Sequence, residues 1–157
     1  MSKLHSTPDF GKLEKYESWR EQWENPSDLN LFSYLRSECH PEDTLIVSKL
    51  LLPDMLCVDD GVFLELSFNE STYLSLKKKG ECTSSIEQSM NHTLLYDMYD
   101  GCPSNVSDEV FVRLSVLLKY SWDLVLRDKF PEKQFTITIE NNIDDYGPSI
   151  TFYQCST

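Results

Sequence analysis

The sequence predicts an α+β fold in which several helices pack on a small antiparallel sheet built from two hairpins. Two observations lead to this prediction. Residues 55–68 and 135–153 each contain two runs of alternating apolar residues joined by a polar connection, which is typical of β-hairpins. In most of the remaining chain, apolar residues recur every three or four positions, which indicates amphipathic helices.

The N-terminal third of the chain is predicted to form three helices. A first helix is expected over residues 10–24, because apolar residues recur there in steps of three or four. Ser27 or Asp28 is the expected N-cap of a second, short helix, since their side-chain oxygens accept hydrogen bonds from free backbone N–H groups. Pro41 is expected to open a third helix, because its fixed φ and missing N–H suit the first turn. Pro53 ends that helix.

The first hairpin is expected between residues 55–58 and 62–68, with an Asp-Asp-Gly turn at residues 59–61. Asp and Gly tolerate the positive φ of a type I′ turn, so the turn chemistry fits a tight hairpin. Asn69 is the expected N-cap of the helix that follows, and Gly80 is its expected end.

Two further helices are expected before the second hairpin. The first runs from about residue 84 to Gly101, and the longer one opens at Ser107 and ends before Pro131. An apolar stripe along the longer helix predicts that it is the central helix of the core. The stripe consists of Phe111, Leu114, Leu118, Trp122 and Val125, widened by Val110, Leu117 and Leu124.

The C-terminal hairpin is expected from alternating residues at 135–139 and 150–153, joined by a polar connection at residues 141–148. The sequence contains no internal repeat, low-complexity tract or interdomain linker. We therefore expect a flexible tail over residues 1–9 and a single globular domain over residues 10–157.

The composition excludes several classes of partner. The chain of 157 residues has 26 acidic and 14 basic residues, which gives a formal net charge of −12. Binding to nucleic acids or anionic membranes requires Lys and Arg, so neither is an expected partner. No apolar run reaches the roughly 18–20 residues of a membrane span, and the N-terminus lacks the pattern of an export signal. We therefore expect a cytoplasmic protein.

The acidic residues are segregated along the chain. Residues 50–76, 80–112 and 134–157 contain five, six and three acids, and they contain no Lys or Arg. Such segregation predicts a negative face that attracts a basic partner, rather than a generally solubilising charge.

Residues suited to catalysis or metal binding are few. The five Cys include no Cys-x-x-Cys pair and the three His no His-x₃-His pair, so the sequence predicts no metal site and no cofactor. The odd Cys count predicts reduced and mostly buried thiols. His92 lies five residues before Asp97, which is a poor spacing for neighbours on a helix. We expect a protein that is not an enzyme; an enzyme of unrecognised type would depend on His92, Asp97 or Cys57.

The last turn of the helix expected over residues 84–99 is the first candidate binding surface. Asp97 and Asp100 fall at this end, where the helix dipole makes acids unfavourable by roughly 0.3–1 kcal/mol each. Tyr96 and Tyr99 lie beside them; Tyr is enriched in interface cores, and nearby acids steer a basic partner. The alternative interpretation is that both Tyr pack inward and both Asp are merely solvated.

The connection of the C-terminal hairpin is the second candidate binding surface. It contains Asp144, Asp145 and Tyr146. A rigid hairpin can present such a loop to a partner at low entropic cost, although many such loops are ordinary solvent-facing turns. We predict that these residues also contact the partner.

Two stretches, residues 53–64 (PDMLCVDDGVFL) and 90–99 (MNHTLLYDMY), and the acidic single-domain profile carry a resemblance. Together they resemble the immunity proteins of bacterial toxin systems, including inhibitors paired with contact-dependent growth-inhibition toxins. That class often neutralises basic nuclease toxins by covering them with acidic surface. The resemblance implies an inhibitor that occludes the active or substrate-binding surface of a cognate toxin domain such as a nuclease. A different acidic interaction module or adaptor is the alternative, and a toxin gene directly upstream would separate the two.

Overall fold

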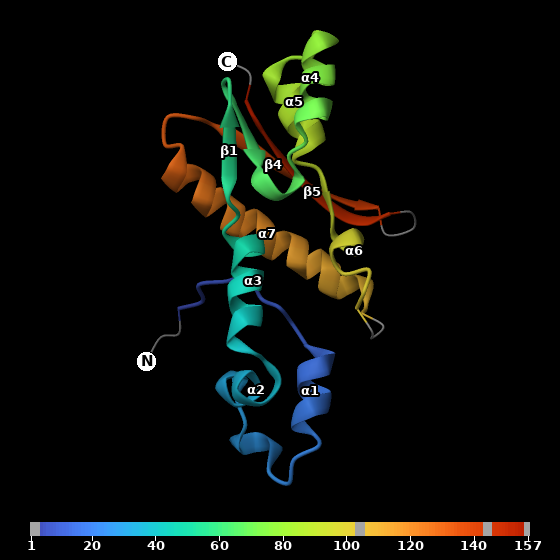
Figure 1. The fold of residues 1–157 in the computed structure, drawn as a ribbon. Helices are drawn as coiled ribbons and strands as arrows, with labels where there is room; N and C mark the ends of the chain where they lie inside the picture. The colour runs from blue at the N-terminus through green and yellow to red at the C-terminus, as the bar shows by residue number, and fades with distance from the viewer. Residues whose placement is uncertain (1–3, 103–105, 143–145, 156–157) are drawn as a thin grey trace. The chain divides into compact units, whose positions relative to one another are not determined.

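The computed structural model describes residues 4–102, 106–142 and 146–155 of the chain (Figure 1). The described residues form seven α-helices and five strands, which confirms the α+β class predicted from the sequence. They divide into two compact units. The expectation that residues 10–157 form one domain stays a prediction.

The first unit, residues 1–50, is helical in its described part and is built around Trp19. Trp19 is buried, and its ring centroid lies 6.1 Å from that of Tyr16 and 5.2 Å from that of Tyr34. Aromatic pairs at these separations contribute beyond the area that they bury. The elements are α1 (Glu14–Arg20), the 3₁₀ turn η1 (Pro26–Asp28), α2 (Leu31–Glu38) and α3 (Pro41–Leu51), whose last residue belongs to the second unit.

Two sequence predictions for this unit are wrong at the helix ends. The helix α1 spans Glu14–Arg20 instead of the expected residues 10–24. At its start, Gly11 has a φ of 58°, which a right-handed helix excludes. The N-cap of α2 is Asn30, whose side chain accepts hydrogen bonds from the second and third helical N–H groups at 2.9 and 3.2 Å. The expected caps, Ser27 and Asp28, lie in η1 instead.

The second unit, residues 51–157, holds two antiparallel sheets (Figure 1). The strands are β1 (Met55–Val58), β2 (Gly61–Leu64), β3 (Thr93–Leu94), β4 (Phe135–Asn142) and β5 (Gly147–Gln154). Both predicted hairpins are confirmed, although β2 ends at Leu64 rather than at residue 68. The hairpins belong to separate sheets of order β1-β2 and β3-β5-β4. The strands β4 and β5 extend into the polar connection expected at residues 141–148.

Helices cover both faces of β5. The helices are α4 (Glu70–Lys78), α5 (Thr83–Met90), α6 (Leu95–Met98) and α7 (Asp108–Lys129), and a 3₁₀ turn η2 (Glu65–Ser67) precedes α4. On one face, Phe152 packs against Trp122 of α7 with ring centroids 5.9 Å apart. On the other face, Thr151 Oγ1 donates a hydrogen bond of 2.8 Å to the Gln88 carbonyl of α5. Successive strand residues point to opposite faces, so β5 lies between the two helices.

The buried face of α7 is centred on Leu118, Trp122 and Leu126, as expected for a core helix. The prediction that Leu124 widens this face is wrong, because its side chain is 51% exposed. At 100° per residue, Leu124 lies on the side of the helix opposite Leu118 and Trp122.

The helix expected from residue 84 to Gly101 is interrupted after Met90. Asn91 follows the last helical residue and is fully buried. Its side chain forms hydrogen bonds with the backbone of two strands. Its Oδ1 accepts a hydrogen bond from Leu64 N–H at 2.9 Å, and its Nδ2 donates to the Phe152 carbonyl at 3.1 Å. The chain then pairs with β5 as β3. These long-range hydrogen bonds therefore end the helix at Met90, although the apolar residues keep a helical spacing beyond it.

Glu87, one turn before Asn91, continues the link between the two sheets. Its carboxylate is fully buried and accepts hydrogen bonds from Val62 N–H at 2.8 Å and Gln154 N–H at 2.7 Å. The Gln154 side-chain amide donates a third bond, of 2.7 Å. Because Glu87 and Asn91 are four residues apart, they share one face of the helix turn. The pair thus occupies backbone groups along the outer edges of β2 and β5.

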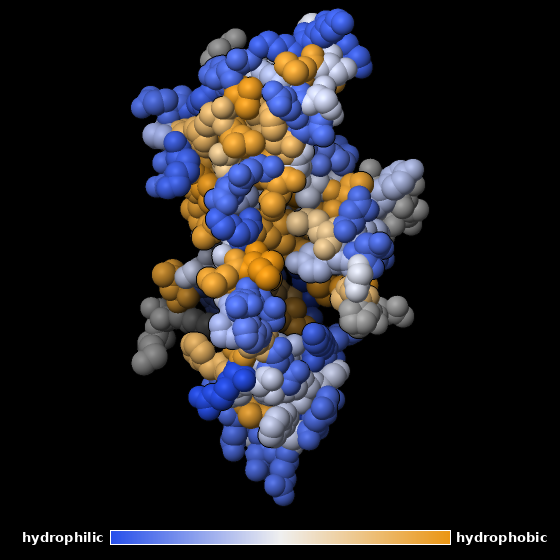
Figure 2. All heavy atoms as spheres, in the orientation of Figure 1, coloured by the Kyte–Doolittle hydropathy of each residue, from blue (hydrophilic) through white to orange (hydrophobic). Residues whose placement is uncertain are grey.

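The β1–β2 turn departs from the predicted type I′ geometry. Of its residues, Asp59 has a positive φ, 52°, whereas type I′ requires positive φ at both central positions. Gly61 is needed for space instead, since a Cβ there would lie 2.6 Å from the Phe63 ring. Phe63 packs in a buried cluster with residues of α4 and α5. Figure 2 shows hydrophobic side chains gathered over this hairpin, with hydrophilic side chains around them.

Two lysines hold the turn. Asp59 accepts hydrogen bonds from Lys77 and from the Tyr73 hydroxyl, and Asp60 forms an ion pair of 2.6 Å with Lys133. The hydrogen bonds from Lys77 and Tyr73 hold the pKa of Asp59 below its ordinary value. Since the folded state then favours the charged carboxylate, Asp59 stabilises the fold above the pKa of the unfolded chain, and this contribution is lost as the pH falls through the lower folded pKa.

Replacing Asp59 by Asn is therefore expected to lower the melting temperature at pH 7. Asn also tolerates positive φ, so the change removes the charge rather than the turn conformation. The difference from the wild type should shrink as the pH falls below about 4, the ordinary pKa of Asp. Thermal melts between pH 7 and pH 2 measure it. The exposed Glu81→Gln variant is the control; an Asp59→Asn deficit that does not change with pH would contradict this account.

Candidate partner-binding surface

The structure places one acidic surface at the end of β5 where α6 and the start of α7 meet. We call this surface the acidic end; it consists of Tyr96, Asp97, Tyr99, Asp100, Asp108, Glu109 and Tyr146. It includes five of the seven predicted site residues, from both predicted segments. The other two, Asp144 and Asp145, lie outside the described residues.

Tyr96 joins the parts of the acidic end. Its ring packs edge-on against Phe111 at 4.8 Å between centroids, and its hydroxyl donates a hydrogen bond of 2.6 Å to Asp108. That hydrogen bond raises the pKa of Tyr96. The ring also fills the space over Gly147, where an added Cβ would lie 2.5 Å from it. Gly147 has a φ of 76°, so backbone and packing both require glycine there.

Asp97 and Asp100 carry charge that the protein itself does not neutralise. Both side chains are exposed, and within the described ranges neither carboxylate forms a hydrogen bond or an ion pair. The expectation that they oppose a helix dipole is wrong for Asp97. It lies in the first turn of the four-residue α6, where a negative charge is favourable, and Asp100 follows that helix.

Apolar and aromatic side chains accompany these acids. Met98 is 39% exposed, Tyr99 is 36% exposed and Tyr146 is 66% exposed. Tyr99 packs partly against Phe111, and this desolvation raises its pKa. A half-exposed ring anchored at one edge loses little conformational entropy on binding, which is a property of interface anchors. The alternative of inward packing was left open for Tyr96 and Tyr99. It describes Tyr96, which packs on Phe111 and over Gly147, better than the partly exposed Tyr99.

The basic residues of the second unit are largely neutralised internally. Five of its eight Lys and Arg residues form ion pairs with acids of the same unit. One of these pairs, between Arg113 and Glu109, lies at the acidic end itself. Surface ion pairs add little stability, but they cancel positive charge that would otherwise offset the acids. The field near Asp97 and Asp100 is therefore negative.

The residues named for an enzyme alternative lie on or next to different elements. His92 is exposed beside Ser85, Gln88 and Ser89 at an open hollow of about 330 Å³. The strand β3 separates it in sequence from Asp97, and Cys57 is exposed on β1. The described part of the chain contains no cluster of three His, Cys, Asp or Glu that could hold a metal.

The expectation of mostly buried thiols is wrong. All five Cys are free, and four of them are exposed; Cys39 is half-buried. Cys39 and Cys82 flank helices, and Cys155 follows β5, so these three residues lie at the ends of elements.

Within the described residues, no helix has the length and hydrophobicity needed to cross a bilayer.

Sequence reasoning missed the buried pair Glu87 and Asn91. The sequence did contain an indication of this pair, because Glu87 and Asn91 lie next to Ile86 and Met90 on a helix face that is otherwise apolar. A carboxylate at such a position requires hydrogen-bond donors from other elements, and the sequence does not show which elements supply them.

Comparison of the chain with protein-family models, curated proteins and solved structures gives no match. The functional interpretation therefore rests on the chemistry of the acidic end.

Proposed function

We propose that the protein is an acidic protein-binding inhibitor of the immunity type. In this proposal, it neutralises a cognate, basic toxin domain by occluding the domain's active or substrate-binding surface. The observation that carries the proposal is the pair of exposed, unpaired carboxylates of Asp97 and Asp100 beside the exposed side chains of Met98 and Tyr99.

This combination fits a basic protein surface better than a small ligand. Carboxylates at the rim of an interface accelerate association with a positive partner, and Met and Tyr side chains supply contact area at its centre. The two hollows of about 330 and 300 Å³ in the described residues are lined by residues outside the acidic end, and small-molecule sites are concave. An inhibitor that covers a nuclease surface would need such a negative patch in place of the nucleic-acid phosphates.

Co-expression with the protein encoded by the adjacent gene tests the immunity role. If the adjacent gene encodes the toxin domain, wild-type protein is expected to restore the growth of cells that express this domain. It is also expected to bind the domain with 1:1 stoichiometry in calorimetry. The Asp97→Asn, Asp100→Asn double variant should bind at least tenfold more weakly, since truncating charges at an interface costs more than about 1.4 kcal/mol in total.

A matched double variant, Glu65→Gln with Glu81→Gln, controls for the change in net charge. Both residues are exposed and lie away from α6 in sequence. This control should rescue growth and bind like the wild type. Equal loss in both double variants would mean that overall charge, rather than the acidic end, governs binding. Absence of any complex with the toxin domain would contradict the immunity role.

A further inference from the structure

The outer edge of β4 is the longest strand edge in the described residues without a partner. The register pairs every residue from Phe135 to Asn142 with β5, so β4 contains no bulge. The Gln134 carbonyl accepts a hydrogen bond of 2.9 Å from Cys155 N–H. In an antiparallel pair such bonds recur at every second residue, so even-numbered residues of β4 direct their N–H and C=O groups toward β5.

The odd-numbered residues of β4 therefore direct their N–H and C=O groups away from β5. These residues are Phe135, Ile137, Ile139 and Asn141. The opposite edge of β5 supports this assignment, because Phe152 O and Gln154 N, which lie across from Ile137 and Phe135, bond to α5. Within the described parts of the chain, no hydrogen bond reaches the outward groups of β4.

The outer edges of β5 and β2 are closed. The outer edge of β5 is occupied by β3, Asn91 and Glu87, and that of β2 by the same two side chains. Proteins usually protect an open edge with charged side chains, Pro or a bulge. The strand β4, with the sequence FTITIENN, has no Lys, Pro or bulge, and its one charged residue is Glu140 near the end of the strand. An edge of this length, roughly 25 Å for eight residues, matches an added strand.

We propose that the outer edge of β4 accepts an extended, basic segment of a partner protein as an additional antiparallel strand. Only another extended main chain presents donors and acceptors at the spacing of this edge. Charge selects a basic segment. Glu132 and Glu140, near the two ends of β4, are exposed and have no ion pair in the described chain, while nearby Lys133 is bound to Asp60.

The same charge disfavours a second copy of this chain as the occupant. Two copies with a net charge of −12 repel each other, whereas a basic segment is attracted. The inference relies on the proposed function only for the basic character of the partner, because the edge itself is independent of the acidic end.

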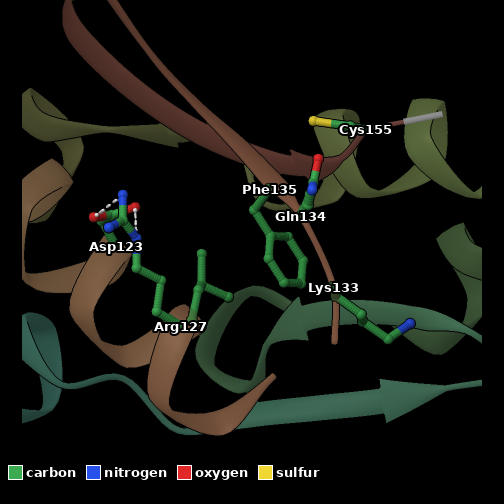
Figure 3. A pocket seen from close by; sticks show the side chains of 7 residues that line it. Asp123, Arg127, Lys133, Gln134, Phe135 and Cys155 are labelled. Atoms are coloured by element: carbon green, nitrogen blue, oxygen red, sulfur yellow. Dashed lines mark hydrogen bonds and ion pairs between the residues drawn. The ribbon is translucent and has the colours of Figure 1, made fainter. Parts of the chain in front are cut away.

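A hollow of about 300 Å³ lies at the start of β4 and can receive a side chain of the added strand. Figure 3 shows the ring of Phe135 between β4 and the end of α7, with Asp123 and Arg127 joined as an ion pair on that helix. Leu126 and Phe135 provide apolar surface, and Lys133 and Gln134 provide polar groups. In strand addition, main-chain hydrogen bonds supply affinity and such pockets supply side-chain selectivity.

A synthetic peptide of about nine residues, alternating Thr and Val with Lys at both ends, is the probe. Titrated into the ¹⁵N-labelled protein, it is expected to shift the amide resonances of Phe135, Ile137 and Ile139. The same peptide with Glu in place of Lys should bind at least tenfold more weakly at low salt, because it meets the negative ends of β4. Shifts confined to α6, or equal binding of both peptides, would overturn the proposal.

Variants at Ile139 separate the strand edge from side-chain packing. Ile139→Pro removes one outward N–H and blocks the edge, so peptide affinity should fall at least tenfold. Ile139→Ala shortens the side chain but keeps the N–H, and it should bind within about threefold of the wild type. If Ile139→Pro does not fold, Asn141→Pro makes the same test at the exposed end of the strand, with Asn141→Ala as its control.

Two further measurements distinguish this inference from the proposed function. The Asp97→Asn, Asp100→Asn variant should bind the peptide like the wild type, since the acidic end is not part of the edge. Sedimentation equilibrium of the protein alone should show a monomer. A dimer that Ile139→Pro dissociates would assign the edge to a second copy and would overturn the proposal of a foreign strand.

Discussion

Replacing Trp122 by Ala is expected to lower the free energy of unfolding by about 3–5 kcal/mol, the usual range for truncating a large buried aromatic residue. Trp122 is 1% exposed, and its ring contacts Phe152 of β5. The Phe152 ring in turn packs against Phe135 at 5.9 Å between centroids. Truncation therefore opens a cavity at the junction of α7 with β4 and β5. Chemical denaturation, monitored by far-UV circular dichroism, measures the loss.

Tyr120→Ala is the matched control for Trp122→Ala. Tyr120 lies on the same helix, is also aromatic and is 43% exposed, so its truncation should cost less than about 1 kcal/mol. If the Trp122→Ala protein does not fold, Trp122→Phe should show a smaller loss in the same direction. A loss below about 1 kcal/mol for Trp122→Ala would mean that α7 is not held on the sheet by this face.

Replacing Glu87 by Ala is expected to destabilise the protein by about 3–5 kcal/mol, which is comparable to Trp122→Ala. The change removes the acceptor of two backbone N–H groups, those of Val62 and Gln154, and of the Gln154 side chain. Each buried donor left without a partner costs about 1–3 kcal/mol. Glu87→Gln should lose less, about 1–3 kcal/mol, because one oxygen stays as an acceptor while the new amide faces an N–H group.

Gln88→Ala is the control at the next position of α5, where the side chain is exposed. It should change stability by less than about 0.5 kcal/mol. Hydrogen exchange adds a local measurement. In Glu87→Ala the Val62 and Gln154 amides should exchange faster than the amides of α7, whereas uniform acceleration would indicate only global destabilisation.

Local signals predicted many of the elements. The N-cap at Asn69 is confirmed by its hydrogen bond from Thr72 N–H, and the long helix after Ser107 and both hairpins are also confirmed. Asn69 caps α4 with its own side chain, and apolar periodicity marks the long helix and the paired strands. The fold class therefore follows from local sequence patterns.

The sequence did not predict the break in the helix after Met90 or the separation of the hairpins into two sheets, because both depend on long-range hydrogen bonds. Residues 84–99 have a helical period, but Asn91 bonds to strands that lie 27 and 61 positions away in sequence. The two hairpins stay in separate sheets because Asn91 and Glu87 occupy the edges of β2 and β5 that could otherwise pair with another strand. For the candidate site, the sequence alone predicted that Asp97 and Tyr99 combine negative charge with an aromatic side chain. The contact of Tyr96 with Gly147, which places the hairpin end beside α6, required the folded structure.

The association rate with the cognate toxin domain, measured as a function of salt, tests the central claim of an acidic binding face most directly. The test variant replaces four residues by Asn: Asp97, Asp100, Asp144 and Asp145. The control variant replaces four exposed acids by Gln: Glu21, Glu24, Glu65 and Glu81. For the wild type and the control, the association rate constant should fall at least tenfold between about 20 mM and 500 mM salt, because screening removes electrostatic steering. For the test variant, the rate constant should be low throughout and nearly independent of salt. Identical salt dependence in the wild type and the test variant would contradict the account.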